Sequence, residues 1–218
     1  MEKNAMNRSG KPSIVGIYKW TVCLLILLIA GHSSAAAVSP DKFIKVHSDK
    51  VLTKVLSNKE KLKANPKLLY NLIRADILPY IDFVRMSRSI LGKHWRKATK
   101  VEQKAFSKEF TELLIRTYGT ALLGYSGQEI EYKPAQLKNK GKVAIVRTKV
   151  PNSGSAPVSI DYRLYDNKNS WKVVDIKIGS VSLVSNYRTN FAAHISRNGL
   201  GDLIRQLQEK NRGASKRQ

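Results

Sequence analysis

The chain has 218 residues, of which 39 are Lys or Arg and 16 are Asp or Glu, so its net charge is +23. Its single cysteine excludes a disulfide-bonded framework within the chain. The length allows one domain with a substantial core, with or without a helical lobe. The charge favours anionic partners, namely nucleic acid, membrane surfaces or acidic proteins.

Residues 1–37 predict a secretory signal peptide. A basic segment precedes the apolar run WTVCLLILLIAG, and the small-residue stretch SSAAA follows it. The run is about 11 residues long, well short of the roughly 20 that cross a membrane. Ala35 and Ala37 fit the A-x-A pattern and predict cleavage before Val38, although cleavage after Ala35 is also compatible. An uncleaved N-terminal anchor is the alternative interpretation.

The expected mature chain, residues 38–218, has 35 basic and 15 acidic residues, a net charge of +20, and no cysteine. Thiol chemistry is therefore excluded, and export argues against nucleic acid as the partner. The basic residues are scattered, except in the C-terminal stretch KNRGASKRQ. We expect a single domain over 38–208 and a basic disordered tail over 209–218.

The first half of this mature chain is patterned as helices. Ser39-Pro40 and Asn65-Pro66 each combine an N-cap with a first-turn proline. The apolar stripes that follow them are Ile44, Val51, Leu52 and Val55, and then Leu68, Leu69, Leu72, Ile73 and Ile77. Pro79 should end or kink the second helix. The apolar face of the next helix consists of Phe83, Met86 and Ile90.

The clearest helix starts at Thr99, which forms a capping box with Glu102. It should run to about Gly124. Its apolar side consists of Phe106, Phe110, Leu113, Leu114, Thr117 and Ala121. The helical half therefore presents several amphipathic faces that need a partner surface.

Beyond Gly127 the hydrophobic period changes to two, as in strands. Four short segments separated by turn residues predict a sheet: QEIEYKP, KVAIVRTKV, PVSIDYRLYD and SWKVVDIKI. One face of the third segment carries Val158, Ile160, Tyr162 and Leu164. This apolar side must be covered by the helices before and after it. The predicted fold class is α+β: a helical N-terminal half packed on a curved antiparallel sheet of about four strands, closed by C-terminal helices.

The last strand should run almost directly into the first closing helix. In DIKIGSVSLVSNYRTNF, residues 175–191, the strand pattern ends at Ile178 and Gly179-Ser180 makes the break. The helical face that follows consists of Leu183, Tyr187 and Phe191. We expect the closing helices to extend to about Lys210.

Catalytic and metal-binding patterns are sparse. The three histidines of the mature chain, which fit neither H-E-x-x-H nor H-x-E spacing, are His47, His94 and His194. GYSGQ, residues 124–128, lacks the last glycine of a G-x-S-x-G elbow. The aspartates that could supply an acid or base, without visible pairing, are Asp161, Asp166 and Asp175. The sequence gives no positive evidence of catalysis, a metal or a cofactor.

Two ordered blocks of residues carry a family resemblance. The first consists of Asp82-Phe83, Met86, Leu91-Gly92, Trp95-Arg96, Ala98, Gln103, Phe106, Phe110, Leu113-Leu114 and Thr117-Tyr118. The second consists of Trp171-Lys172-Val173, Asp175, Val181-Ser182-Leu183-Val184, Asn186-Tyr187-Arg188 and Phe191. In this order and at these separations they resemble the MlaC family of periplasmic phospholipid-binding proteins, also called toluene-tolerance proteins. Gly179-Ser180 departs from the family, which commonly has an acidic residue and then glycine there.

The resemblance implies a periplasmic carrier without enzymatic activity or cofactor, whose cargo is phospholipid. Such a carrier moves lipid between an inner-membrane ABC transporter with an MCE-domain component and an outer-membrane lipoprotein associated with porin. It thereby maintains outer-membrane lipid asymmetry. Each CH₂ group that leaves water gains about 0.8 kcal/mol of free energy. Acyl chains therefore need an apolar cavity to cross an aqueous compartment.

We expect a lipid cavity between the apolar side of the sheet and the helices. The candidate sheet residues are Ile145, Val158, Ile160, Tyr162, Leu164, Val174 and Ile176. The candidate helix residues are Phe83, Met86, Ile90, Phe110, Leu114, Tyr118 and Tyr187. At each position ordinary core packing is the alternative, because periodicity does not separate a filled core from a cavity.

Three questions remain open at this stage. Arg96 and Arg188 are interpreted either as contacts for a lipid phosphate or as structural ion pairs that orient helices. A small-molecule enzyme on a similar cone-like sheet would need Asp161 or Asp175 deep in a pocket. A structural or adaptor protein would have a closed core.

Overall fold

The computed structural model describes residues 38–152, 155–168 and 170–216, and the predicted signal peptide lies outside these ranges. The helices of the first half are α2 (Pro40–Ser57), α3 (Lys59–Ala64), α4 (Pro66–Asp76), η2 (Leu78–Tyr80), α5 (Phe83–Leu91), α6 (Lys93–Lys97), α7 (Lys100–Tyr118) and η3 (Gly119–Gly124). The later elements are β1 (Glu131–Tyr132), β2 (Gln136–Lys138), β3 (Val143–Asn152), β4 (Ser155–Asp166), β5 (Trp171–Ile178), β6 (Val181–Ser182) and α8 (Leu183–Lys216). No helix within the described ranges has the length and hydrophobicity needed to span a membrane.

The predicted helix starts are confirmed. α2 begins at Pro40 and α4 begins at Pro66. At the start of α7, Glu102 N donates to Thr99 Oγ1 at 3.2 Å, and Thr99 N donates to Glu102 Oε2 at 2.8 Å, which completes the capping box. The hydrogen bonds from Thr99 lower the pKa of the Glu102 carboxyl. Beyond Tyr118 the helix tightens into the 3-10 helix η3, which ends where the sequence predicted.

The strands form one antiparallel sheet in the order β1-β3-β4-β5-β6, and β2 also pairs with β3. β1, β3, β4 and β5 correspond to the four predicted segments, while β2 and β6 are short additions. Across the three central strands Thr148 lies opposite Ile160, which lies opposite Ile178. The curved antiparallel sheet and the α+β fold class are therefore confirmed.

A bulge in β5 changes which residues share the inner face of the sheet. Arg163 of β4 lies opposite Asp175, but the next residue, Leu164, lies opposite Val173. Val174 is thus the extra residue of the bulge. As a result Val173, which is 5% exposed, packs with Leu164 on the inner face.

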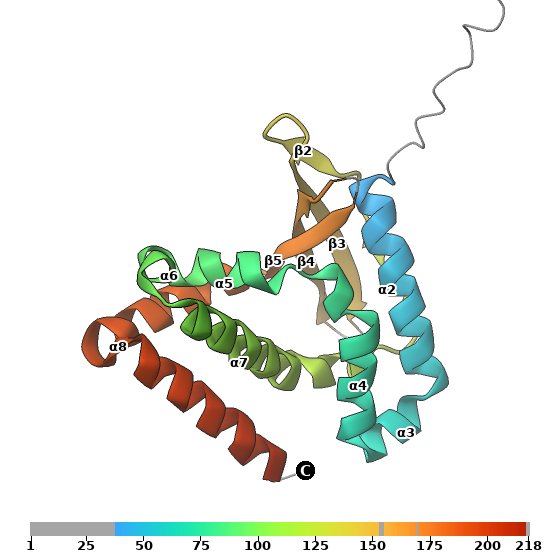
Figure 1. Cartoon of the computed structure of the whole chain (residues 1–218). Helices are drawn as coiled ribbons and strands as arrows, with labels where there is room; N and C mark the ends of the chain where they lie inside the picture. Colours follow the sequence, from blue (N-terminus) through green and yellow to red (C-terminus); the bar gives the residue numbers. More distant parts are fainter. Residues whose placement is uncertain (1–37, 153–154, 169, 217–218) are drawn as a thin grey trace, which may run out of the picture. The chain divides into compact units, whose positions relative to one another are not determined.

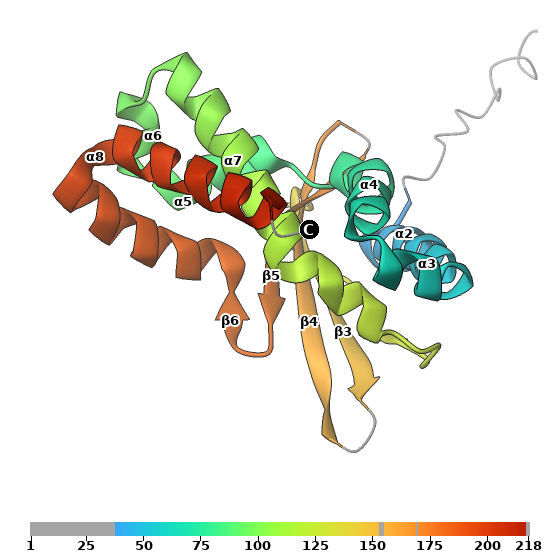
Figure 2. The ribbon, with the colours of Figure 1, turned by 90° about the horizontal axis from the view of Figure 1, so that it is seen from below.

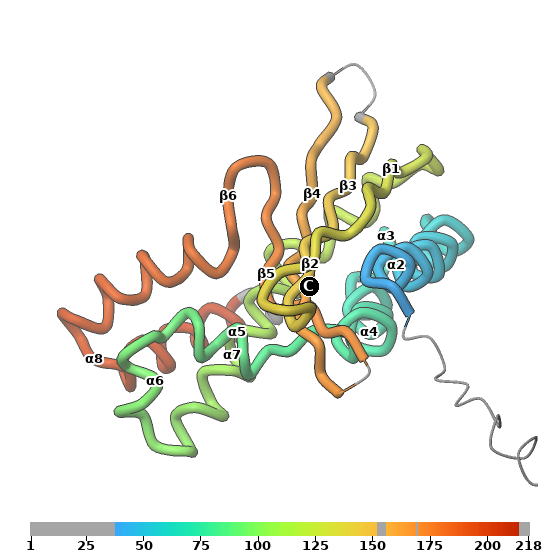
Figure 3. The backbone as a smooth tube through the Cα atoms, turned by 90° about the horizontal axis from the view of Figure 1, so that it is seen from above, coloured from blue at the N-terminus to red at the C-terminus, as the bar shows by residue number. Residues whose placement is uncertain are grey.

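Two groups of helices flank the sheet. Figures 1 and 2 show α2, α3 and α4 on one side and α5, α6, α7 and α8 on the other, and the tube in Figure 3 shows the same division. The sheet contacts both groups, through α2 against β3 and through α5 and α8 against β5. The helices before and after the sheet both cover it, as the pattern of the sequence predicted.

Three buried clusters make up the core. The helical cluster packs α5, α7 and α8 around residues that include Met86, Ile90, Phe106, Phe110, Phe191 and Leu203. The α2–α4 cluster consists of Val51, Val55, Leu62, Leu69, Tyr70, Ile73 and Ile115. The sheet cluster consists of Phe43, Ile44, Ala144, Val146, Leu164 and Val173. The apolar residues are thus divided among separate clusters, which leaves room for a cavity between them.

The closing helix α8 bends at Gly199, whose φ of 83° is outside the helical region. Residues 183–198 and 200–216 therefore form two legs, which Figure 2 shows folded back on each other. The second leg is tied to α7, because buried Asn211 donates from Nδ2 to Glu109 O at 3.0 Å and to Glu109 Oε2 at 2.9 Å. This buried contact and the burial of Leu207 explain why the helix continues to Lys216, through most of the stretch expected as a disordered tail.

Candidate functional site

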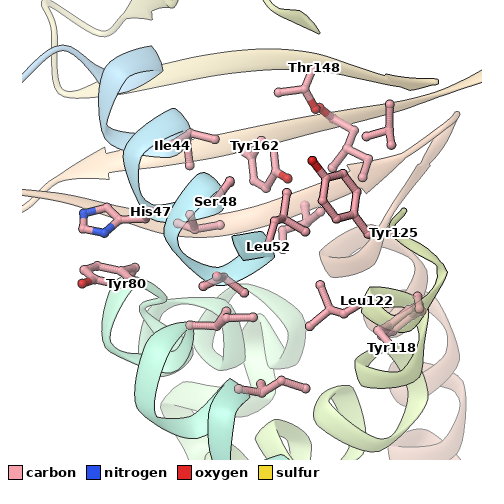
Figure 4. A pocket seen from close by; sticks show the side chains of 18 of the residues that line it. Ile44, His47, Ser48, Leu52, Tyr80, Tyr118, Leu122, Tyr125, Thr148 and Tyr162 are labelled. Carbon is pink, nitrogen blue, oxygen red and sulfur yellow. The ribbon is translucent and has the colours of Figure 1, made fainter. Parts of the chain in front are cut away.

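A cavity of about 510 Å³ lies between the inner face of the sheet, helices α2 and α4, and the C-terminal part of α7 with η3. Figure 4 shows side chains from these elements pointing into it. The cavity is within the roughly 300–1,000 Å³ range of small-molecule sites. Most of the side chains that line it are apolar or aromatic.

The sheet supplies one wall through the period-two alternation of its strands. The inward residues of this wall are Thr148 and Val150 of β3, Val158, Ile160 and Tyr162 of β4, and Val173, Ile176 and Ile178 of β5. Val158 is 37% exposed, so this end of the wall reaches the surface. The wall is therefore a mainly apolar surface that is partly exposed at Val158.

Helix α2 supplies the opposite wall with residues at helical spacing: Phe43, Ile44, Ser48, Val51 and Leu52. Below it, η3 comes close to α4 because Gly119 has no side chain. A Cβ at Gly119 would lie 2.7 Å from Ile73 Cδ1. This close approach brings Tyr118 and Leu122 to the cavity (Figure 4).

The cavity contains a few hydroxyl groups in an otherwise apolar lining. Figure 4 shows Ser48, Tyr125, Thr148 and Tyr162 around the same space. Thr148 Oγ1 donates to Ile160 O at 2.9 Å. Burial raises the pKa of the Tyr162 phenol to about 12, so this hydroxyl is uncharged at neutral pH. Uncharged hydroxyls can hydrogen-bond a polar part of a ligand without placing a charge in the cavity.

Two ionisable side chains, His47 and Asp76, lie at the border of the cavity. The His47 ring stacks on Tyr80 with 3.6 Å between the ring centroids. Burial, followed by the charges of Lys50 and Lys172, lowers the pKa of His47. Asp76 also borders the cavity, but its carboxylate pairs with Lys54 at 2.6 Å and is thereby neutralised.

The predicted site residues divide between the cavity and the core. Those that line the cavity are Phe83, Leu114, Tyr118, Val158, Ile160, Tyr162 and Ile176. Those that pack in or against the helical cluster are Met86, Ile90, Phe110 and Tyr187. Leu164 belongs to the sheet cluster, because the inner face of β4 passes from the cavity into that cluster. The sequence pattern is the same for cavity residues and core residues, so only the tertiary structure distinguishes the two groups.

Two further predicted residues lie outside the cavity for reasons of strand geometry. Val174 is displaced by the bulge in β5, which puts Val173 at the cavity instead. Ile145 alternates with the inward residues Ala144 and Val146 and therefore belongs to the other face of β3.

Several cavity residues were missed by sequence reasoning. They come from α2, α4 and the segment from η3 onward, and include Phe43, Ser48, Leu52, Ile77, Leu122 and Tyr125. The apolar stripes of α2 and α4 were visible, but their position next to the sheet was not. Nothing in the local pattern of Leu122 and Tyr125 distinguishes them from ordinary surface or core residues.

The two arginines have different surroundings, and neither lines the cavity. Arg188 Nε donates to Ser89 O at 2.7 Å and so connects α8 to α5. Arg96 is exposed on α6, and no ion pair links it to a carboxylate in the described ranges. The contact of Arg188 is of the kind expected for a structural residue.

The aspartates considered for catalysis also lie outside the cavity lining. Asp161 pairs with Arg147 at 3.8 Å. Asp175 accepts hydrogen bonds from Ser182 Oγ at 2.7 Å and Val184 N at 3.1 Å, which fixes the start of α8. Among the residues that the structure describes, no group of three or more His, Cys, Asp or Glu is placed to hold a metal.

Comparisons with known proteins agree on one family. A family model described as "MlaC protein" matches residues 45–209. The intermembrane phospholipid transport system binding protein MlaC of Haemophilus influenzae is 25% identical over 203 residues, which cover 90% of this chain and 95% of that protein. The toluene tolerance protein ttg2D of Pseudomonas putida is 32% identical over 178 residues, which cover 81% of this chain and 82% of that protein.

A solved structure has the same fold. The phospholipid-binding protein from Ralstonia solanacearum, determined in complex with a phospholipid, is 33% identical and superposes with a TM-score of 0.75. The match covers 82% of this chain and 99% of that one. The names of the matched proteins refer to phospholipid transport, phospholipid binding or toluene tolerance, and none of them states an enzymatic activity.

Proposed function

The chain belongs to the MlaC family, and on this premise we propose that it is a phospholipid carrier that holds acyl chains in the cavity between the sheet and α2. The observation that carries the proposal is the apolar cavity of about 510 Å³, bordered by neutral hydroxyls and by a carboxylate that is already paired. An acyl chain in this cavity replaces water along apolar walls, at about 0.8 kcal/mol for each buried CH₂.

The contacts that such a chain makes are non-directional, so the walls accept chains of different lengths. The hydroxyls of Ser48, Thr148 and Tyr162 are suited to hydrogen-bond the ester region of a bound lipid. We assign lipid contact to the predicted residues that line the cavity and to Leu52, Leu122 and Tyr125.

We further propose that the carrier works in the periplasm without catalysis or cofactor. It would exchange phospholipid with an inner-membrane ABC transporter that has an MCE-domain component, and with an outer-membrane lipoprotein associated with porin. Two observations support this role. The sequence has the pattern of a secretory signal peptide, and the Haemophilus relative is named as part of an intermembrane phospholipid transport system.

The alternatives have less support. A structural or adaptor protein has no need of an open apolar cavity of this size. An enzyme needs a reactive group that faces its substrate. Asp161 and Asp175 do not line the cavity, and both are bonded to structural partners.

Mass spectrometry of protein purified without detergent tests the proposal. We expect phospholipid to co-purify in a fixed ratio to protein, and lipid-free protein to take up phospholipid from liposomes. Absence of both would contradict the carrier function.

A paired variant tests the cavity itself. Ile160→Trp adds bulk to the cavity wall, so we expect the phospholipid content to fall by at least half while the protein remains folded. The control is Arg163→Trp, because Arg163 is an exposed residue of the same strand that does not line the cavity. Equal lipid content in both variants would contradict the assigned site.

A further inference from the structure

A second surface, which does not line the cavity, concentrates positive charge in a short segment of the chain. Six basic side chains occur between residues 93 and 108, and all six are exposed: Lys93, Arg96, Lys97, Lys100, Lys104 and Lys108. Within the described ranges none of the six pairs with a carboxylate. Basic residues elsewhere, such as Lys54, Arg74 and Arg85, do form such pairs. No ion pair among the described residues therefore neutralises the positive charge of this segment.

The helical geometry of α7 arranges half of these residues in one row. Lys100, Lys104 and Lys108 are four residues apart, so their side chains project from the same side of the helix. Val101 is next to this row, and at 78% it is the most exposed large apolar side chain among the described residues. We call Lys100, Val101, Lys104 and Lys108 the lysine row.

The carboxylates nearest in the sequence, Glu102 and Glu109, form no ion pair with these lysines among the described residues. Glu102 is held by hydrogen bonds from Thr99 in the capping box. Glu109 is buried and bonded to Asn211 on the opposite side of α7. The lysine row and the three basic residues of α6 thus form a positive surface with one protruding apolar side chain.

We propose that this surface docks the protein on anionic phospholipid bilayers. Lysines close to an anionic membrane strengthen binding through its surface potential, and an apolar side chain between them can enter the headgroup region. A bilayer needs no groove or fixed pattern of hydrogen bonds, which suits a convex row of flexible lysines. The proposal names a partner of the proposed lipid carrier and so rests on that function.

The position of the surface fits this role. It lies at the start of α7, next to α6 (Figure 1). The cavity is lined instead by residues from the end of α7 and from η3. Docking through the lysine row therefore does not involve the residues that line the cavity. The same contact would give a partner to Arg96, which forms no ion pair among the described residues.

Co-sedimentation with vesicles tests the proposal. We compare vesicles of phosphatidylcholine alone with vesicles that also contain phosphatidylglycerol, at low and high salt. We expect the full mature chain to bind only the vesicles with phosphatidylglycerol, and to release them at high salt because the charges are screened. Each lysine near such a surface contributes about fivefold, so K100Q/K104Q/K108Q should weaken binding by about a hundredfold. Val101→Ser should cause a smaller loss that does not depend on salt.

The matched control is K138Q/K142Q/K149Q, which removes the same charge from exposed lysines of the sheet. We expect it to retain binding within about threefold of the wild-type chain.

If K100Q/K104Q/K108Q folds poorly, the single variant Lys104→Glu takes its place. Equal losses of binding in the two triple variants would overturn the proposal. It would also be overturned if the wild-type chain did not bind anionic vesicles, or if it bound an acidic protein but no vesicles. Phospholipid content is measured on every sample. A protein that contains phospholipid but does not bind vesicles would contradict the docking surface and leave the carrier function supported.

Discussion

At the scale of single residues, Arg188 and Arg96 illustrate how one residue type takes two roles. Arg188 links the start of α8 to the end of α5 through Ser89 O. Arg96 projects from α6 into solvent. Both were candidates for a lipid phosphate, yet neither lines the cavity. We therefore expect the first to act on stability and the second on surface charge.

Arg188→Ala should lower stability without changing the cargo. It removes one hydrogen bond from a charged donor, worth about 1 kcal/mol at an exposed site, which lowers Tm by about 2–4 °C for a chain of this length. Thermal unfolding with lipid analysis measures both effects. Arg96→Ala is the control and should leave Tm unchanged, whereas a loss of bound phospholipid in Arg188→Ala would indicate a headgroup role instead.

Tyr162 gives a prediction for alkaline pH. Its pKa is raised from about 10 in the unfolded chain to about 12 in the fold. The unfolded chain releases this proton first, so the stability contributed by the neutral phenol is complete below pH 10 and is lost as the pH rises to about 12. We expect the free energy of unfolding to fall less steeply between pH 10 and 12 in Tyr162→Phe. Denaturant titrations measure this slope, and identical slopes would refute the assignment.

At the scale of elements, α7 has two functions along its length. Its first turns pack Phe106 and Phe110 against α5 and α8. Its last turns bring Leu114 and Tyr118 to the cavity, and η3 extends this wall with Leu122. The division follows from the neighbours of α7, which are α5 and α8 in the helical cluster and α4 and η3 near the cavity.

Phe110→Leu tests this division. Phe110 is fully buried and stacks parallel to Phe106 with 5.8 Å between the ring centroids. Loss of this packing should cost about 1–3 kcal/mol, while the phospholipid content of the folded protein should remain unchanged. Chemical denaturation and mass spectrometry on the same preparation separate the two effects, and Ile160→Trp should show the opposite combination.

At the scale of the whole molecule, the proposed lipid cargo should add to the stability of the fold. A ligand that binds the folded chain stabilises it by mass action, by about 2.7 kcal/mol when its concentration is 100 times its dissociation constant. The walls come from both helix groups and from the inner face of the sheet. Bound lipid should therefore hold these parts together as one cooperative unit.

Removal of the lipid should lower Tm measurably. We expect a decrease of about 5–10 °C after delipidation, and recovery when phospholipid is added back. Calorimetry measures the change. Ile160→Trp should show a smaller decrease because its cavity is partly filled, and an unchanged Tm after complete delipidation of the wild-type chain would argue against coupling.

Much of the fold was predictable because its signals are local. A proline after an N-cap residue fixes the starts of α2 and α4, the Thr99–Glu102 pair fixes the start of α7, and period two identifies the four main strand segments. These signals depend on a residue and its near neighbours in the chain. The family resemblance also came from the sequence, through two blocks in α5–α7 and around the start of α8.

The tertiary structure alone decided which apolar residues line the cavity. Ile160 and Leu164 have the same pattern on one strand, yet Ile160 faces the cavity and Leu164 is fully buried in the sheet cluster. The bulge that exchanges Val174 for Val173 is likewise a property of strand pairing. The physical reason is that an apolar side chain gains a similar free energy whether it leaves water for a filled core or for a lipid-filled cavity. The sequence by itself therefore determines that the residue is buried, and only the arrangement of distant elements determines what it is buried against.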